Sequence, residues 1–331
     1  MNMIRARIAG TGSATPEMIL NNADLEAIVD TSDDWIIKRT GIRERRIALK
    51  GRNETTLNLA TSASLKALEM AKIGADALDM IVVGTVSQDM HFPSVACFVQ
   101  DALNAKKAAA FDVSAGCTGF LYALSVASNA IATGTCRSAL VIGVERLSAM
   151  TNWEDRTTCV LFGDGAGAVV LTSSQDDGIL ASALGADGTC WELLYSPNGS
   201  PNVPEILKDT YRKPFFIKMD GNRLFKKAII SMADISSEVL EKSGVSPSDI
   251  RLVVPHQANF RIIQALAERL SIPMEKVYVN IHKYGNTSSA SIPIALDEAA
   301  REGLLGPGDI VLLTAFGAGL TWGASVIRWS F

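Results

Sequence analysis

The stretch that decides the fold is Phe111-Asp-Val-Ser-Ala-Gly-Cys-Thr-Gly-Phe120, in which a short strand turns through glycine into an uncharged helix. It places Cys117 at the start of that helix. A thiol at a helix N-terminus feels the positive end of the helix dipole, which favours its thiolate form. Taken alone, the same pattern also fits a small buried cysteine at a tight turn. The rest of the chain has to distinguish the two interpretations.

An approximate internal repeat places a second turn of this kind later in the chain. The run Leu78–Gly84 aligns with Asp249–Pro255 at an offset of 171 residues (249 − 78), and both runs have the apolar, β-branched composition of buried strands. Farther on, Cys117 aligns with Asn286 at an offset of 169 (286 − 117). The strand before Asn286 is expected at residues 280–282. The register makes Asn286 the counterpart of Cys117 in the second half of the chain.

Glycines at matching positions support this register. Gly134 lies 17 residues after Cys117 (134 − 117), and Gly303 lies 17 residues after Asn286 (303 − 286). Glycine just beyond the last turn is a typical helix stop signal. A β-branched run then follows in both halves, so the two helices are expected to have the same length and the same sequel.

The alternation of strands and helices predicts an α/β fold built from two similar halves, residues 1–175 and 176–331. No charged residue lies between positions 113 and 136, so the first of the two helices has no solvated face. The second helix is uncharged from Asn286 to Leu296 and charged beyond it. We therefore expect a central helical layer between two mixed sheets, with further helices outside.

A candidate catalytic group emerges where the strands end. His256 directly follows the strand Asp249–Pro255, and α/β folds gather their ligands at the carboxyl ends of strands. Singly, His256 fits a structural histidine and Asn286 a plain N-cap. Together with Cys117 they supply a nucleophile that can hold an acyl group and two donors for a developing oxyanion.

Composition limits the classes of function. The chain has 331 residues, 48% of them apolar, and a formal net charge of −4, which favours neither nucleic acid nor an anionic membrane as a partner. Its five cysteines form no C-x-x-C pair, so we expect no disulfide framework, no zinc site or other metal, and a cytoplasmic location. Residues 1–8 fit a strand rather than a signal peptide. The Gly-rich segments Ile8–Ser13 and Phe162–Ala168 lack the dinucleotide-binding fingerprint.

These residues bring a known family into view. The chain resembles the β-ketoacyl-acyl-carrier-protein synthase III family of the thiolase superfamily, the condensing enzymes that start bacterial type II fatty acid synthesis. The matching motifs run over nearly the whole length: Asp30–Ile36, Arg39–Arg45, the Cys117 turn, Asp155–Thr158, Phe162–Gly167, Val254–Asn259, Tyr284–Ser288 and Ala315–Gly319. The resemblance implies a five-layered αβαβα fold with an internal two-fold duplication.

The resemblance also implies the reaction. Cys117 would take a short acyl group, with acetyl as the expected starter, from acyl-CoA, and the backbone N–H groups of Cys117 and Ala318 would form the oxyanion hole. Malonyl-acyl carrier protein would then enter, and His256 and Asn286 would polarise its thioester while carbon dioxide leaves. The resulting enolate would attack the acyl-cysteine and give a 3-oxoacyl carrier protein. The family needs no cofactor beyond its CoA thioester substrate and works as a homodimer.

Binding residues follow by position. For CoA, the family pattern implies Trp35 and Arg156 at the adenine, Arg39 and Asn259 near the phosphates, and Gly221 in the pantetheine tunnel. The following sentences list the remaining implied contacts. The carrier protein would meet Gln257, Ala258, Asn259, Phe260 and Arg261, assisted by Lys226 and Lys227. The acyl pocket would be bordered by Phe316 and by Phe92, the latter contributed across the dimer interface.

Two departures from the family pattern bear on these roles. Ala318 stands where many members carry glycine, so a left-handed backbone there would be strained. Leu270 and Ser271 follow Arg269, and Glu268 precedes it, so the carrier-protein surface is expected to be less basic than in some relatives.

Several alternatives can be weighed on the same residues. A biosynthetic thiolase needs a second catalytic cysteine near its C-terminus, and no cysteine follows Cys190. Elongating synthases use a second histidine where this chain has Asn286. A non-catalytic scaffold would have lost the three site residues, and a nicotinamide oxidoreductase would need the missing Gly-rich turn. The alternative that stays open is a condensing enzyme of secondary metabolism that uses a branched, medium-chain or aromatic starter.

Overall fold

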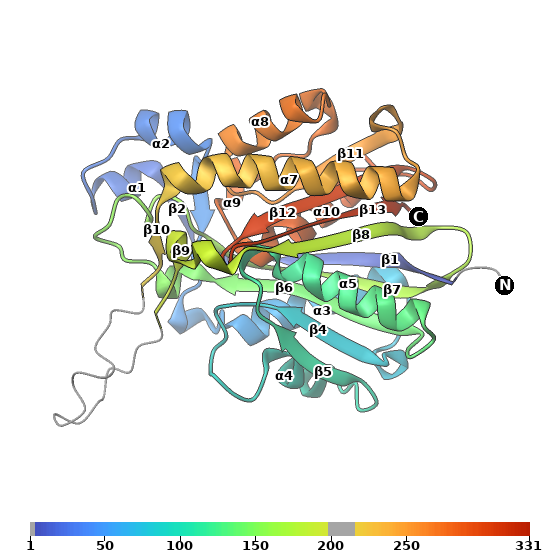
Figure 1. Cartoon of the computed structure of the whole chain (residues 1–331). Helices are drawn as coiled ribbons and strands as arrows, with labels where there is room; N and C mark the ends of the chain where they lie inside the picture. Colours follow the sequence, from blue (N-terminus) through green and yellow to red (C-terminus); the bar gives the residue numbers. More distant parts are fainter. Residues whose placement is uncertain (1–3, 198–215) are drawn as a thin grey trace.

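Two mixed β-sheets frame the chain, which a computed structural model describes at residues 4–197 and 216–331 (Figure 1). The first sheet has the strand order β1 (Arg5–Ala14), β7 (Asp164–Ser174), β6 (Ser138–Arg146), β4 (Met80–Gly84) and β5 (Ala109–Val113). The second has the order β8 (Gly178–Ala186), β13 (Thr321–Arg328), β12 (Ile310–Gly317) and β11 (Ile250–Pro255). Two small two-stranded sheets are formed by β2 (Ile19–Asn21) with β3 (Glu44–Arg46) and by β9 (Leu194–Tyr195) with β10 (Lys218–Met219).

The two large sheets share one pairing pattern. In the first, β4 and β6 are parallel, and β7 and β1 follow in antiparallel register. In the second, β11 and β12 are parallel, and β13 and β8 follow in antiparallel register. The strands predicted to correspond, β4 with β11 and β6 with β12, thus occupy equivalent positions. The internal repeat read from the sequence is a repeat of the fold.

Helices form three layers around these sheets, as Figure 1 shows. The helices are α1 (Asn22–Glu26), α2 (Asp33–Thr40), α3 (Thr56–Ala71), α4 (Val95–Ala102), α5 (Gly119–Ala132), α7 (Gly221–Ser243), α8 (Phe260–Arg269), α9 (Ile281–Tyr284) and α10 (Ser291–Arg301). One apolar core joins α5 and α10 to strands of both sheets. A second core packs α3 and α4 on the first sheet, and a third packs α7 and α8 on the second. The five-layered αβαβα arrangement is confirmed.

Short 3₁₀ turns connect several of these elements. They are η1 (Lys50–Arg52), η2 (Ala75–Ala77), η3 (Gly116–Thr118), η4 (Leu147–Met150), η5 (Gly188–Leu193), η7 (Pro247–Asp249), η8 (Met274–Lys276) and η9 (Ser288–Ala290). Two of them matter for the site, because η3 precedes α5 and η9 precedes α10. The predicted helix stops are confirmed at the other ends: Gly134 and Gly303 both adopt left-handed backbone, with φ of 75° and 71°.

The repeat is incomplete at one place. The strand expected at residues 280–282 is absent there, because Ile281 begins the short helix α9. The counterpart of β5 is reduced to a single bridge between Val253 and Val277. The Gln257 side chain accounts for the change: its Oε1 accepts hydrogen bonds from the backbone N–H groups of Asn280 (3.0 Å) and Ile281 (3.2 Å). Donors taken by a side chain cannot extend a strand ladder.

The strands β7 and β8 lie on either side of the expected boundary between residues 175 and 176, ending at Ser174 and beginning at Gly178. That division stays a prediction. None of the helices in the described ranges is both long and apolar enough to cross a membrane.

Residues 19–49 form a separate excursion that packs beside the second half. Within it, α2 ends at Gly41, which adopts a left-handed backbone (φ 80°) and leaves no room for a side chain, since a Cβ there would lie 2.5 Å from that of Phe260. The end of α2 therefore touches the start of α8. The buried Arg45 fixes this segment through hydrogen bonds to the carbonyls of Leu20 (3.1 Å) and Val160 (2.9 Å).

Candidate active site

Cys117 lies in a turn that the end of β12 holds in place. Gly116 adopts φ 55°, and a Cβ at that position would lie 2.8 Å from the backbone nitrogen of Ala318. A Cβ at Gly317 would lie 2.5 Å from the backbone nitrogen of Cys117. Both glycines are therefore required by close backbone approach. The contact brings the end of a second-half strand directly against the cysteine of the first half.

The groups around the Cys117 sulfur can stabilise negative charge, but burial dominates. The backbone N–H groups of Cys117 and Ala318 and the Ser288 hydroxyl interact with the sulfur and favour the thiolate. Burial nevertheless raises the pKa of the thiol to about 11, and the carboxylate of Glu145 adds to the rise. The expectation that the helix start makes Cys117 a thiolate is therefore wrong for the empty site, because desolvation outweighs the dipole.

Ala318 is accommodated without the strain expected from its sequence position. It is not among the residues with positive φ in the described chain, and the glycine that follows it takes the unusual backbone instead, with φ 143° at Gly319. The donor N–H of Ala318 is thus kept at no conformational cost.

His256 follows β11 and is fully enclosed. Its backbone N–H donates to the Thr314 carbonyl of β12 (2.8 Å), and its ring Nδ1 lies 2.7 Å from the Ser291 hydroxyl oxygen. The backbone N–H of Gln257 also donates to that oxygen (3.3 Å). Burial lowers the pKa of His256 to about 3, so the imidazole is neutral at physiological pH.

Asn286 is held by backbone bonds on both sides. Its N–H donates to the Leu161 carbonyl (2.8 Å), and its carbonyl accepts from the N–H of Gly163 (3.0 Å). Its side-chain Oδ1 accepts from the backbone N–H of Ser288 (2.8 Å). Because the oxygen of the carboxamide is occupied in this way, the amide NH₂ group is the end left to act as a donor.

The three predicted residues are connected through the turn η9. Ser291, one residue after η9, contacts His256, and Ser288, its first residue, contacts both Cys117 and Asn286. The turn η3 that carries Cys117 packs against both η9 and β12. The structure therefore gathers groups from both halves around one turn. Sequence reasoning did not identify Ser288 or Ser291, whose only signal was their position beside the Asn286 turn.

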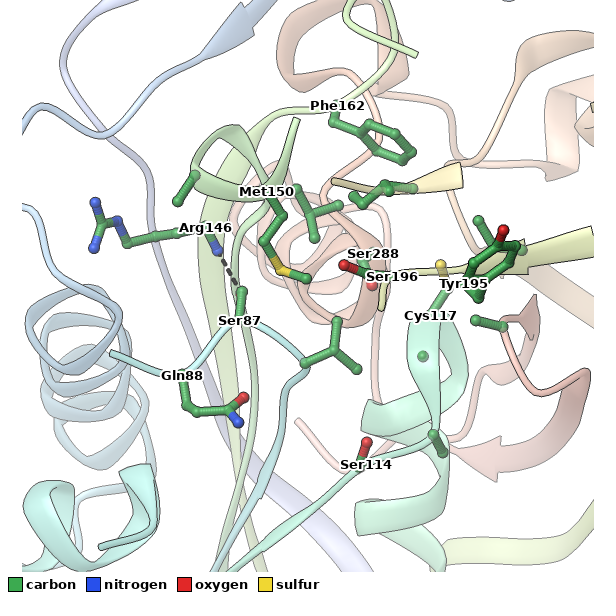
Figure 2. A pocket seen from close by; sticks show the side chains of 18 of the residues that line it. Ser87, Gln88, Ser114, Cys117, Arg146, Met150, Phe162, Tyr195, Ser196 and Ser288 are labelled. Atoms are coloured by element: carbon green, nitrogen blue, oxygen red, sulfur yellow. Dashed lines mark hydrogen bonds between the residues drawn. The ribbon is translucent and has the colours of Figure 1, made fainter. Parts of the chain in front are cut away.

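A cavity of about 1090 Å³ opens beside Cys117, and Figure 2 shows Cys117 and Ser288 pointing toward it. Its apolar wall includes Val86, Leu147, Met150, Phe162, Leu194 and Ile217, and its polar lining includes Ser87, Arg146, Ser288 and Thr321. Its composition suits a chain that is apolar at one end and thioester-like near the cysteine.

The two residues expected at the acyl pocket are found elsewhere in this chain. Phe316 is buried in the core on the α7 side of the second sheet, and Phe92 is 84% exposed. Neither is among the described residues that line the cavity. Residue type alone predicted them, and the wall is instead supplied by the segments after β4 and β6, which the sequence did not single out.

Glu145 is a buried acid at this site that sequence reasoning missed. It ends β6, and its oxygens accept hydrogen bonds from the hydroxyls of Ser87 (2.5 Å), Ser289 (2.9 Å) and Ser288 (3.1 Å). Burial raises its pKa to about 7. A lone carboxylate at the end of an otherwise apolar nine-residue strand was the available signal.

The residues expected to hold CoA largely meet. The guanidinium carbon of Arg39 lies 4.8 Å from the Trp35 ring centroid, and that of Arg156 lies 4.5 Å from it. The Asn259 side chain donates to the Arg39 carbonyl (3.0 Å), which adds it to the same group. Because Arg156 stacks directly on Trp35, a purine would have to displace that guanidinium to enter. Gly221, at the start of α7, has only an ordinary contact of 3.6 Å at a Cβ position.

The carrier-protein segment divides into a buried and an exposed part. Gln257 is buried, and its amide donates to the carbonyls of Pro255 (2.9 Å) and Tyr278 (3.1 Å). Its side chain is committed to the fold, as its bonds at the start of α9 also show. In contrast, Phe260 and Arg261 are exposed, and Ala258 and Asn259 are partly so.

Basic residues near this segment differ in how free their charges are. The Arg261 guanidinium lies 5.3 Å from the ring centroid of Phe225 on α7. Lys226 is exposed, whereas Lys227 lies 3.7 Å from Asp187. Arg261 and Lys226 are therefore the more available cations. Within residues 4–197 and 216–331, no group of three or more His, Cys, Asp or Glu side chains is arranged to hold a metal ion.

Comparison with known proteins gives consistent matches. Two family profiles match, 3-Oxoacyl-[acyl-carrier-protein (ACP)] synthase III at residues 111–188 and its C-terminal counterpart at residues 240–329. The β-ketoacyl-acyl-carrier-protein synthase III of Caldanaerobacter subterraneus subsp. tengcongensis is 54% identical over 328 residues, which cover 99% of this chain and 98% of that protein.

Solved structures agree. The crystal structure of the 3-oxoacyl-acyl-carrier-protein synthase III of Aquifex aeolicus is 52% identical, with a TM-score of 0.91, over 98% of this chain and all of that one. The priming β-ketosynthase of the R1128 polyketide biosynthetic pathway is 36% identical, with a TM-score of 0.91, over 98% of this chain and 96% of that one.

Proposed function

Because the chain belongs to the β-ketoacyl-acyl-carrier-protein synthase III family of condensing acyltransferases, we propose that it initiates fatty acid synthesis with Cys117 as its acyl carrier. In the first half-reaction, Cys117 attacks the thioester of acetyl-CoA. The N–H groups of Cys117 and Ala318 bind the oxyanion of the tetrahedral intermediate, and CoA leaves as its thiol. The observation that carries this role is the convergence of both N–H groups on the Cys117 sulfur beside an open cavity.

The second half-reaction forms the carbon–carbon bond. Malonyl-acyl carrier protein replaces CoA, and its thioester oxygen binds between His256 and Asn286. Loss of carbon dioxide leaves an enolate, whose carbon attacks the acyl-Cys117 thioester. The product is a 3-oxoacyl carrier protein, and the Cys117 thiolate takes up a proton.

Two serines give His256 and Asn286 the polarity that this step needs. We infer that the Ser291 hydroxyl donates to Nδ1 of His256, which puts the ring proton on Nε2. The Ser288 N–H occupies Oδ1 of Asn286 and leaves the NH₂ group to donate. Two neutral donors stabilise the enolate oxygen without adding a charge that would repel the malonyl carboxylate.

Intact mass after mixing with acetyl-CoA tests the nucleophile. We expect one acetyl adduct on the wild-type chain, no adduct on Cys117→Ala, and an unchanged adduct on Cys97→Ala, an exposed cysteine that serves as the matched control. An adduct that persists in Cys117→Ala would refute the assignment.

For CoA, we propose that the adenine binds at Trp35 and Arg156, with Arg39 and Asn259 near the phosphates and Gly221 along the pantetheine. Replacing Trp35 by alanine should raise KM for acetyl-CoA about 10-fold by removing the aromatic surface. The acetyl thioester of N-acetylcysteamine lacks the nucleotide, so its KM should not change. Equal effects on both substrates would contradict adenine binding at Trp35.

For the carrier protein, we propose that Arg261 and Lys226 meet acidic groups, with Ala258, Asn259 and Phe260 in the contact. Arg261→Glu should raise KM for malonyl-acyl carrier protein about 10-fold and leave KM for acetyl-CoA unchanged, since a rim charge acts on association with its partner. Arg137→Glu, an exposed arginine before β6, is the control. A rise in KM for both substrates of Arg261→Glu would speak against a docking role.

Further parts of the proposal concern assembly and substrate range. We propose a cytoplasmic homodimer that uses no cofactor besides its CoA thioester substrate, with the exposed Phe92 directed at the partner subunit. The acetyl starter is favoured over a specialised starter of secondary metabolism because the synthase III relatives are 52–54% identical and the polyketide priming enzyme 36%. Competition among acetyl, branched, medium-chain and aromatic CoA thioesters tests the choice.

A further inference from the structure

Glu145 is a buried carboxyl group at the end of β6 that the two half-reactions leave without a role. Its Oε2 accepts from Ser87, and its Oε1 accepts from Ser288 and Ser289. Among the described residues, no cationic side chain forms an ion pair with it, and the neighbouring Arg146 is paired with Asp89 at 3.0 Å. A buried acid without a counter-ion is costly, and such groups concentrate at functional sites.

Ser288 connects Glu145 to the nucleophile. Its hydroxyl donates to Oε1 of Glu145 at 3.1 Å, so the lone pairs of its oxygen are available to a second donor. The same hydroxyl interacts with the Cys117 sulfur, and both residues line the cavity (Figure 2). Ser288 also adopts φ 49°, a left-handed backbone that costs a non-glycine residue about 1–3 kcal/mol and persists where the surroundings impose it.

We propose that Glu145 accepts the thiol proton of Cys117 through the Ser288 hydroxyl while acyl-CoA acylates the cysteine, an inference that rests on the proposed function. As the sulfur–carbon bond forms, the S–H bond breaks, Ser288 takes that proton, and the proton of its own hydroxyl passes to Oε1 of Glu145. When the carbon–sulfur bond to CoA breaks, the proton returns through Ser288 to the departing sulfur. Glu145 ends the half-reaction ionised, as it began.

The pKa values of the groups set the timing of this transfer. The pKa of Glu145 is raised to about 7 and that of Cys117 to about 11, so the proton moves as the thiol attacks rather than before it. Acylation should therefore accelerate as pH rises through about 7. Of the other groups that surround Glu145, Cys117 on η3 titrates far above this range and His256 beside α10 far below it, at about 3. Arg146 on β6 stays paired with Asp89 after β4.

The test is the single-turnover rate of acetyl-Cys117 formation as a function of pH. Glu145→Gln keeps the size of the side chain but cannot take the proton, so we expect a loss of about 100-fold at about pH 8 and no rise near pH 7. Asp164→Asn is the matched control, because Asp164 is another buried carboxyl with a raised pKa that bonds to Ala48 and Ser148 instead. It should keep the rise.

A second variant and a second readout separate the relay from a structural role. Ser288→Gly suits the left-handed backbone and removes the hydroxyl, so it should lose the same rate and the same rise, and it decides alone if Glu145→Gln does not fold. The pH midpoint of Cys117 alkylation should fall in Glu145→Gln, because a repelling charge is gone. An acylation rate at or above that of wild type, or a retained rise near pH 7, in either folded variant overturns the proposal. Failure of the wild type to acylate would instead refute the proposed function.

Discussion

The Cys117 turn and the Asn286 turn share a backbone and differ in what surrounds them. Each follows a left-handed glycine, Gly116 with φ 55° and Gly285 with φ 63°, and each leads through a 3₁₀ turn into a central buried helix. The first turn is followed by small and apolar residues and opens onto the cavity. The second carries serines that bond to Glu145, His256 and Asn286. The duplicated scaffold thus presents the reacting sulfur on one side and the groups that orient it on the other.

The strongest test of this division is Asn286→Ala. It removes a donor to the enolate oxygen, so decarboxylation of malonyl-acyl carrier protein and condensation should fall about 100- to 1,000-fold. Acylation of Cys117 by acetyl-CoA should stay within a few-fold of wild type, because the oxyanion donors of that step lie on η3 and after β12. Intact-mass kinetics and carbon dioxide release measure the two steps separately. Equal losses in both would show that the turns do not divide the work.

The equivalent glycines offer the next comparison. Gly116→Ala and Gly285→Ala each force a side chain onto a left-handed backbone and into a carbonyl or amide, at 2.8 Å from the Ala318 nitrogen and 2.7 Å from the Leu161 oxygen. Each should lose about 3 kcal/mol of stability, measured by urea unfolding. Gly116→Ala should also slow acylation by displacing the Ala318 N–H. If Gly285→Ala slowed acylation as much, the two turns would be functionally coupled.

A smaller effect is expected from Ser291→Ala. Without the hydroxyl, Nδ1 of His256 loses its partner and the ring its fixed orientation, so condensation should slow about 10-fold while acylation is unchanged. Ser128→Ala on α5 is the matched control, since its hydroxyl bonds only to the Ser125 carbonyl within the same helix. A loss in Ser291→Ala that accompanies unfolding, rather than condensation alone, would point to a packing role.

The smallest effect concerns the helix ends, where the two halves are most alike. Gly134 and Gly303 both have left-handed backbone with no atom within 4 Å of a Cβ position. Alanine at either site should cost about 1 kcal/mol from backbone strain alone, and the double variant about the sum. Urea midpoints measure this, with condensation activity unchanged. Unequal costs would mean that the halves differ even at their repeated positions.

The layered fold could be predicted because its signals are local and periodic. Uncharged helices, β-branched runs and stop glycines recur at a constant offset, and each reflects burial or backbone conformation of its own residues. The missing fifth strand could not be predicted, since it depends on a side chain, Gln257, that captures the N–H groups of Asn280 and Ile281. The same capture buries Gln257, which the family pattern had assigned to a partner contact.

The site was predictable where it depends on register and unpredictable where it depends on depth. The repeat paired Cys117 with Asn286, but the charge state expected for the thiol ignored desolvation, which only packing from both halves creates. Glu145 looks like the first exposed residue after an apolar strand, yet serines from two distant segments enclose it. The cavity wall likewise comes from segments after strands, whose direction no residue type reveals.

The strand ladders have a consequence for how competence arises during folding. Every ladder in the two large sheets joins strands on the same side of residue 175, so each sheet can form from its own half. Asn286, however, is bonded through its backbone to Leu161 and Gly163, across that boundary. The reactive centre comes into being only when the two prefolded units dock. The appearance of acylation during refolding would therefore act as a clock for docking, the last event in assembly.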